Sequence, residues 1–230
     1  MSDAGSIAAR SHTGALATEE RVLSGVARQF GVVVVRSPEE IVWGAEALLD
    51  NDKRTPPATG AAVLGFTGGG VIVVADELSR QGLALPEPDP MTVARVTQAL
   101  GGAHRDIYNP FDGGPGARSP DGIETVIGAF TSDPNIGVLA YVAGAGLPTP
   151  TTNHQFQLET LARHVVASNR VGVVASLVPD AACGPYRLPG VTVARGSHEM
   201  AVKARVLADW SRAVLEHQAL PAAEVGAAHV

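Results

Sequence analysis

The sequence contains a single cysteine, Cys183, among its 230 residues. One cysteine cannot form a disulfide within the chain and offers no cluster of thiolates to a metal ion. Because Cys183 lies in a stretch without helix or strand pattern between Pro179 and Pro189, we interpret it as an incidental small residue. The sequence therefore predicts neither a disulfide-stabilised domain nor a metal site.

Long apolar segments and clusters of positive charge are also missing. Apolar runs such as those at residues 32–35 and 71–75 have the length of a strand and are far shorter than a membrane span. The N-terminus has no positively charged region followed by a sustained apolar segment, so no signal peptide is predicted. With a net charge of −6 and no basic run, the chain is not expected to bind nucleic acid. These absences favour a cytoplasmic protein without membrane or nucleic-acid partners.

Aromatic residues are scarce, at 4% of the chain, whereas 45% of the residues are hydrophobic and 17% are charged. This composition is ordinary for a globular α/β protein, whose core must here consist of Val, Leu, Ile and Ala. The length allows one large or two small domains with a sizeable core.

Apolar segments of strand length alternate with segments of helix length along most of the chain. The pairs Ser37-Pro38 and Ser119-Pro120 predict helix starts, because serine caps a helix and proline suits its first turn. The run at 71–74 favours a strand locally, but the glycines before it and the polar residues after it predict a helix. Strands are expected at 32–35, 61–66, 136–142, 171–177 and 191–194 with a strand edge at 105–108, and helices at 17–30, 37–49, 71–81, 91–100, 119–130, 154–168 and 197–215. This alternation predicts a parallel sheet with helices on both faces.

A polar, proline-bearing stretch at residues 51–59 predicts a linker. We expect residues 1–50 to form a partial α/β piece, residues 60–216 a larger domain, and residues 217–230 a tail. One strand and two helices cannot cover both faces of the strand at 32–35, so the first piece should expose an apolar patch and pack on the larger domain, a second copy or a partner. The expected buried side of its second helix consists of Ile41, Val42, Ala45, Leu48 and Leu49.

Three loops are expected to follow strands, where open parallel sheets bind ligands. The first, a threonine with three glycines, puts backbone N–H groups at a helix start and can bind an anion, although a glycine triplet more often makes a tight turn. The second is a similar glycine loop at 143–146. The third offers an amide and a carboxylate, and an Asx turn explains it equally well. The candidate binding residues in these loops are Thr67, Gly68, Gly69, Gly70, Gly144, Asn109 and Asp112.

An N-terminal loop places His12 between Ser11 and Thr13, with Gly14 next. Glycine gives this loop backbone freedom, and an imidazole on a mobile loop can carry a labile group between partners. A lone histidine in such a loop is more often a solvated surface residue. The residues alone leave both interpretations open.

The segment at 11–17, Ser-His-Thr-Gly-Ala-Leu-Ala, resembles the phosphohistidine loop of NDP-forming acyl-CoA synthetases. These are relatives of succinyl-CoA synthetase, which has a similar Gly-His-Ala-Gly-Ala loop. The later motifs follow the layout of the family's second flavodoxin-like CoA-ligase domain: Thr-Gly-Gly-Gly at 67–70, Asp76, Gly-Leu-Ala-Leu-Pro at 82–86 and Asn-Pro-x-Asp at 109–112. The resemblance implies an α/β fold with a flavodoxin-like parallel sheet of the succinyl-CoA synthetase domain type, preceded by a partial second α/β piece.

The same resemblance implies a function. His12 would be the catalytic residue, carrying a phosphoryl group between an acyl phosphate and a nucleotide. Ser11, Thr13, Gly14 and the loop residues named above would bind phosphate or substrate. The overall reaction would convert an acid, coenzyme A and a nucleoside triphosphate into acyl-CoA, nucleoside diphosphate and phosphate. Coenzyme A and Mg-ATP, or another nucleoside triphosphate, are expected to bind mainly to partner domains.

The sequence departs from the family at two points. The usual glycine loop is closer to Thr-Asn-Ala-Gly-Gly, so this chain lacks the asparagine side chain but keeps the backbone donors. Relatives also carry a Rossmann-like CoA-binding domain, most of a first flavodoxin-like domain and an ATP-grasp module. We therefore expect an ATP-grasp subunit and a CoA-binding domain in trans, a small carboxylic acid as substrate, and a homo- or hetero-oligomer. The alternative is a non-catalytic binding or assembly module, or a truncated remnant of such a ligase.

Overall fold

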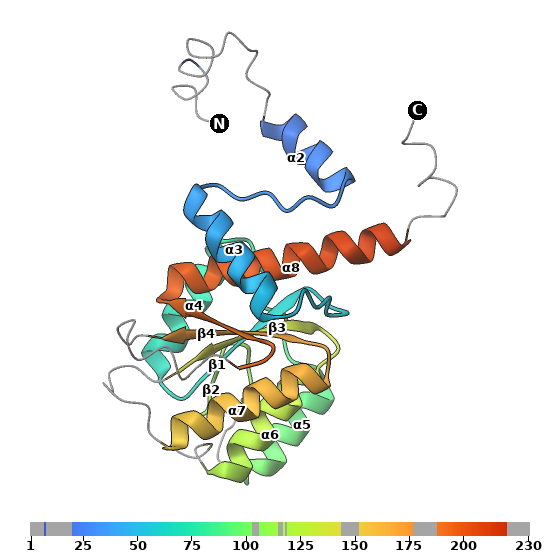
Figure 1. The fold of residues 1–230 in the computed structure, drawn as a ribbon. Helices are drawn as coiled ribbons and strands as arrows, with labels where there is room; N and C mark the ends of the chain where they lie inside the picture. The colour runs from blue at the N-terminus through green and yellow to red at the C-terminus, as the bar shows by residue number, and fades with distance from the viewer. Residues whose placement is uncertain are drawn as a thin grey trace.

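A parallel β-sheet lies at the centre of the computed structural model (Figure 1). The structure describes residue 7 and residues 20–102, 106–114, 117, 119–143, 152–176 and 188–219. Within these residues the sheet has five strands in the order β2-β1-β3-β4-β5, all parallel. This is the flavodoxin order, so the predicted fold class is confirmed. The strands are β1 (Gly60–Gly65), β2 (Phe111–Asp112), β3 (Ile136–Val142), β4 (Val171–Ser176) and β5 (Val191–Arg195).

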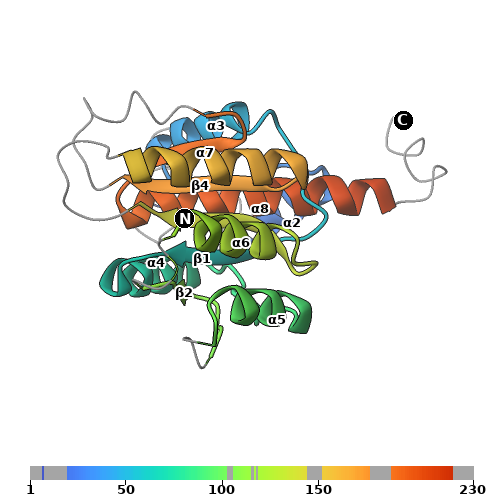
Figure 2. The same ribbon diagram turned by 90° about the horizontal axis from the view of Figure 1, so that it is seen from below.

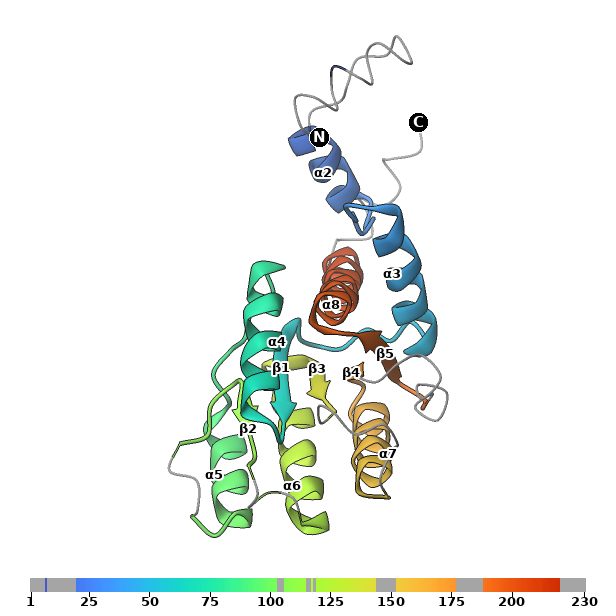
Figure 3. The same cartoon turned by 90° about the vertical axis from the view of Figure 1, so that its left-hand side faces the viewer.

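Helices cover both faces of the sheet (Figures 2 and 3). One face carries α4 (Gly68–Arg80) and α8 (Ser197–Ala219), with α3 (Pro38–Asp50) packed against α8 and β5. The other carries α5 (Pro90–Ala99), α6 (Pro120–Thr131) and α7 (Thr152–Ala167). Side chains of β1 alternate between the two cores, since Ala62 and Leu64 join the α5–α7 side and Ala61 and Val63 join the α4–α8 side. The remaining described helix, α2 (Glu20–Gln29), lies at the far end of α3.

The predicted helix starts are confirmed. The Ser37 hydroxyl accepts a hydrogen bond from the Glu40 N–H at 3.3 Å, and the Ser119 hydroxyl accepts one from the Gly122 N–H at 3.1 Å. The run at 71–74 is helical as predicted, within an α4 that begins three residues earlier, at Gly68. Tertiary packing overrides the local strand preference, because Val71 and Val74 are buried against the sheet while the residues between them face solvent.

The strand predicted at 32–35 is wrong, because this segment forms no strand in the structure. No described strand lies beside it, and an unpaired strand has no ladder to stabilise it. Of the predicted apolar side of the helix that follows, Leu48 packs against the core, and the other four residues are exposed. In α3, Glu40, Gly44 and Ala47 face the protein, whereas Ile41 and Val42 are 61% and 56% exposed.

The loop that contains Asn109 and Asp112 does not follow a strand, contrary to the prediction. Phe111 and Asp112 form β2 itself, beside Leu64 and Gly65 of β1. Asn109 therefore precedes a strand instead of following one, and the described residues 106–108 form no strand edge. The sequence pattern was misleading because β2 is only two residues long.

Residues 51–59 are tied to the sheet by hydrogen bonds. The buried Asn51 accepts one from the Gly172 N–H at 3.2 Å, and the side chain of Asn169 donates one to the Thr55 carbonyl at 3.1 Å. The division of the chain at this segment stays a prediction. At the other end, α8 continues to Ala219, four residues beyond the predicted helix end.

Candidate functional site

The carboxyl ends of β1 and β3 mark the topological switch point of the sheet. The two strands are neighbours, with Gly65 of β1 opposite Val142 of β3. The helix after β1, α4, lies on one face, and the helix after β3, α7, lies on the other (Figure 3). Ligands of doubly wound sheets bind in the crevice at such a point. The candidate site is therefore the edge formed by the start of α4 and the ends of these strands.

The start of α4 supplies the donors of this site. Thr67 is the N-cap residue and makes no side-chain cap hydrogen bond, and Gly68 to Gly70 form the first turn. The N–H groups of a first turn have no partner within the helix. Together with the positive end of the helix dipole, they form a site for an anion such as phosphate.

The glycines around this turn differ in what surrounds the missing side chain. A Cβ on Gly65 would lie 2.7 Å from Val71 Cγ2, and one on Gly70 would lie 3.0 Å from Val142 Cγ1. Both therefore allow β1, α4 and β3 to pack closely. A Cβ on Gly69 would meet no atom of the described residues within 4 Å. Among these residues the space beside Gly69 is open, and this is where an anion could approach the helix start.

Two side chains flank the helix start. The Thr67 hydroxyl is buried and has no hydrogen-bond partner among the residues that the structure describes. Asp112 Oδ2 lies 2.9 Å from the point that a Cβ on Gly68 would occupy, and Asp112 Oδ1 accepts a hydrogen bond from the Gly114 N–H at 3.1 Å. The structure thus brings Thr67, the glycine turn and Asp112 together at one edge of the sheet.

Asn109 lies elsewhere, at the amino half of β1. Its side-chain amide donates to the carbonyls of Ala61 and Pro86 at 2.7 and 3.0 Å, and its oxygen accepts from the Val63 N–H at 3.0 Å. Two of these hydrogen bonds attach the segment before β2 to β1, and the third attaches it to Pro86, in the connection between α4 and α5. The structure does not bring Asn109 to the start of α4.

The other predicted site residues, Ser11, His12, Thr13, Gly14 and Gly144, lie outside the described residues. Within the described part of the chain, no group of three histidine, cysteine or acidic side chains could hold a metal ion. None of the described helices is both long enough and apolar enough to cross a membrane.

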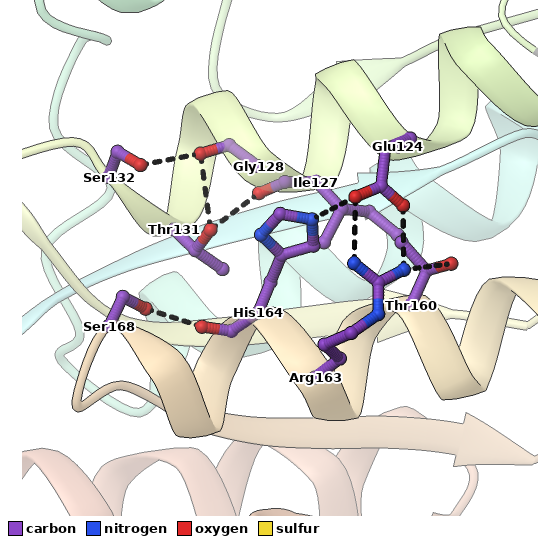
Figure 4. Close-up of polar contacts among 9 residues, drawn as sticks. All are labelled: Glu124, Ile127, Gly128, Thr131, Ser132, Thr160, Arg163, His164 and Ser168. Atoms are coloured by element: carbon purple, nitrogen blue, oxygen red, sulfur yellow. Dashed lines mark hydrogen bonds and ion pairs between the residues drawn. The ribbon is translucent and has the colours of Figure 1, made fainter.

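A polar cluster that the sequence analysis missed joins α6 to α7 (Figure 4). Arg163 donates two hydrogen bonds to the Glu124 carboxylate, at 2.8 and 2.7 Å, and His164 Nε2 lies 2.8 Å from the same carboxylate. The hydrogen bonds from Arg163, reinforced by His164, lower the pKa of Glu124 to about 2. No sequence signal links side chains that lie about 40 positions apart on two helices. The cluster is on the face of the sheet opposite α4, so we interpret it as a link between helices.

The chain resembles known proteins both in sequence and in fold. Residues 1–48 match the family described as "Succinyl-CoA ligase like flavodoxin domain". The chain is 30% identical over 138 residues to the alpha subunit of acetate–CoA ligase (ADP-forming) II from Pyrococcus furiosus. It is 29% identical over 170 residues to acetate–CoA ligase (ADP-forming) I from Archaeoglobus fulgidus. The chain is homologous to ADP-forming acetate–CoA ligases.

The homology covers 60% and 74% of this chain but only 29% and 23% of these ligases. The chain thus spans about a quarter of the length of the curated relatives that it matches. The chain also resembles two solved structures. One is acetyl-coenzyme A synthetase 1 of Ca. Korarchaeum cryptofilum in complex with phosphate and ADP (TM-score 0.64, 18% identity, 96% of this chain and 48% of that chain). The other is PH0766 of Pyrococcus horikoshii (TM-score 0.65, 19% identity, 86% and 45%). At this identity they show a shared fold.

Proposed function

We propose that the chain is part of an NDP-forming acid–CoA ligase that acts through a phosphohistidine at His12. The observation that supports the proposal is the glycine turn at the start of α4, whose N–H groups have no partner within the helix, in a chain homologous to ADP-forming acetate–CoA ligases. Such a ligase makes acyl-CoA, a nucleoside diphosphate and phosphate from a carboxylic acid, coenzyme A and a nucleoside triphosphate. Written from the acyl-CoA side, phosphate first releases coenzyme A and leaves an acyl phosphate.

In this proposal His12 transfers the phosphoryl group by two displacements. A neutral ring nitrogen attacks phosphorus in the acyl phosphate; an N–P bond forms, the P–O bond to the acyl oxygen breaks, and the carboxylate leaves. A nucleoside diphosphate oxygen then attacks phosphorus, which restores the free imidazole and yields the triphosphate. The steps run in reverse for acyl-CoA synthesis.

The start of α4 would stabilise the charge of the transferred group. The equatorial oxygens of a phosphoryl group carry negative charge through the transition state, and fixed backbone donors lower its energy. Thr67, Gly68, Gly69 and Gly70 supply these donors, and the Thr67 hydroxyl, which has no partner in the described structure, can supply one more. Asp112 is an acceptor beside them and would orient a protonated partner such as the imidazole N–H.

Coenzyme A, Mg-ATP and the acid are assigned to partner domains or subunits. The alpha subunit of Pyrococcus furiosus is by its name one part of a larger ligase, and the described residues here contain no cluster for a metal ion. We therefore propose an ATP-grasp subunit and a CoA-binding domain as partners.

A second candidate is a binding or assembly module without turnover. The negative charge of Asp112 beside the start of α4 favours it, because a carboxylate there competes with a bound phosphate. Incubating the chain with radiolabelled acetyl phosphate separates the two candidates. A ligase part acquires label at His12 that is lost in acid and retained in alkali, whereas a binding module acquires none there.

A further inference from the structure

A histidine at the start of α8 is held by a carboxylate of α4. His198 Nδ1 lies 2.9 Å from Glu77 Oε1. The hydrogen bond from His198 lowers the pKa of Glu77, so Glu77 is ionised at neutral pH. An ionised carboxylate only accepts hydrogen bonds, so Nδ1 must carry the proton that it donates. In the neutral imidazole, the lone pair is therefore at Nε2.

Contacts with two further residues fix this pair. Arg80 donates a hydrogen bond to the second Glu77 oxygen, Oε2, at 2.9 Å. The ring of Trp43 in α3 meets the His198 ring edge-on, with the centroids 6.0 Å apart and the planes at 80°. The imidazole thus has a defined tautomer and a defined orientation, set by residues of three helices.

The second ring nitrogen of His198 is accessible. The His198 side chain is 59% exposed, and no hydrogen bond among the described residues uses its Nε2. Gly196, two positions earlier, has a φ of +88°, and a Cβ on it would meet no atom of the described residues within 4 Å. A reagent in solution can therefore reach Nε2.

The start of α8 favours negative charge next to this nitrogen. α8 begins at Ser197, so His198 lies in its first turn, whose N–H groups have no partner within the helix. The positive end of the helix dipole favours an anion there. The acidic Glu199 of the same turn is already paired, because its Oε1 lies 2.8 Å from the ammonium group of the buried Lys203. The helix start can therefore accept the charge of a phosphoryl group.

A second histidine–carboxylate pair has the opposite arrangement. Glu124 holds His164 at Nε2, at 2.8 Å (Figure 4). A Cβ on Gly128 would lie 2.9 Å from His164 Cε1 and 3.4 Å from its Nδ1, so α6 packs against the side of the ring that carries the other nitrogen. His164 is also less exposed, at 25%. Of these two histidines, His198 is the one that offers an accessible nitrogen to a reagent.

We propose that His198 is a phosphorylation site whose Nε2 accepts a phosphoryl group from an acyl phosphate. The Nε2 lone pair attacks phosphorus; an N–P bond forms, the P–O bond to the acyl oxygen breaks, and the carboxylate leaves with that electron pair. The ring gains positive charge in this step, and the Glu77 carboxylate stabilises that charge through the Nδ1–H group. The inference goes beyond the proposed function, since it requires neither His12 nor a partner domain.

The test incubates the full chain with radiolabelled acetyl phosphate at about pH 8, where an ordinary imidazole is neutral. Trypsin then cleaves after Arg195 and Lys203, and residues 196–203 contain His198 as their single histidine. Residues 164–170 likewise report on His164, and residues 11–21 on His12. We expect acid-labile label on 196–203 and none on 164–170. The phosphorus NMR spectrum of the 196–203 peptide should show attachment at Nε2.

Two matched variants separate orientation by the carboxylate from simple accessibility. Glu77→Gln keeps the size of the side chain but removes its charge, and should lower the labelling rate of 196–203 about tenfold or more. Glu124→Gln, in the pair that holds Nε2, should leave that rate within about twofold. An unlabelled 196–203 peptide, equal label on 164–170, or an unchanged rate in Glu77→Gln would each overturn the inference.

The same digest distinguishes this inference from the proposed function. Label on 196–203 without label on 11–21 refutes the phosphohistidine at His12 alone, and the reverse result refutes the site at His198 alone. ATP labelled in its γ-phosphate should leave the isolated chain unlabelled, since the described residues contain no cluster for the metal ion of Mg-ATP. Label from ATP on 196–203 would overturn the assignment of an acyl phosphate as the donor.

Discussion

A substitution at Gly69 should change phosphate affinity at the start of α4 without changing stability. Its missing Cβ faces open space, and alanine is the better helix former. Gly69→Ala should therefore leave the free energy of unfolding within about 0.5 kcal/mol of wild type, while its methyl group obstructs the approach of phosphate and lowers phosphate affinity about three- to tenfold.

Gly65→Ala is the matched control. Its Cβ would lie 2.7 Å from Val71 Cγ2, so it should cost about 1–3 kcal/mol of stability. Calorimetric titration with phosphate and urea unfolding measure the two effects. Unchanged phosphate affinity in Gly69→Ala would exclude the start of α4 as the anion site.

Asn109 is expected to act on stability instead of binding. Asn109→Ala removes three hydrogen bonds to backbone groups and should cost about 2–4 kcal/mol in urea unfolding. Asn135→Ala, at an exposed position, should change stability by less than about 0.5 kcal/mol. A stable Asn109→Ala variant with weakened phosphate binding would instead show that Asn109 takes part in phosphate binding.

Sequence reasoning places Thr67 to Gly70 in a loop just before a helix at 71–81, because glycines follow a strand of apolar residues; in the structure the three glycines are themselves the first turn of that helix. It could not place Asn109, whose partners are backbone groups 46 and 48 positions away. It also could not show which glycine of the turn at 68–70 faces open space among the described residues, because that depends on how β1, α4 and β3 pack.

At the scale of elements, the Glu124 cluster links α6 to α7 in a pH-dependent way. The lowered pKa of Glu124 means that its contribution is complete above the ordinary value of 4.5 and is lost as the pH falls through about 2. Because the carboxylate is 39% exposed, solvent screening limits this contribution to about 0.5–1 kcal/mol.

Glu124→Gln should be less stable than wild type by that amount at pH 7, and the difference should disappear towards pH 2. Urea unfolding across this range measures it, with Glu159→Gln at an exposed position of α7 as the control. A difference that persists unchanged to pH 2 would show that the carboxylate charge is not its cause.

The elements themselves were predictable where local and tertiary preferences agree. The segments at 136–142 and 191–194 are strands as predicted, because apolar β-branched residues there lie between two helical layers. The segment at 32–35 is also apolar and β-branched but has no neighbouring strand within the described part of the chain, so it does not form a strand there. A strand needs a partner, and the sequence of one segment does not say whether the partner is present.

At the scale of the whole molecule, the five-stranded sheet forms a complete flavodoxin-like layer structure, with two cores separated by the sheet. Residues 20–50 instead present apolar side chains outward. The chain spans about a quarter of the length of its curated relatives. We propose that turnover also requires partner domains or subunits.

The most direct measurement is net CoA ligation by the chain reconstituted with an ATP-grasp partner and a CoA-binding domain. The account predicts that His12→Ala abolishes both turnover and acid-labile label, because no other group can hold the phosphoryl between the two half-reactions. Its free energy of unfolding should stay within about 0.5 kcal/mol of wild type, because the sequence predicts a polar loop at His12. His154→Ala, in α7, should keep label and turnover. Label and turnover retained in His12→Ala would contradict the account.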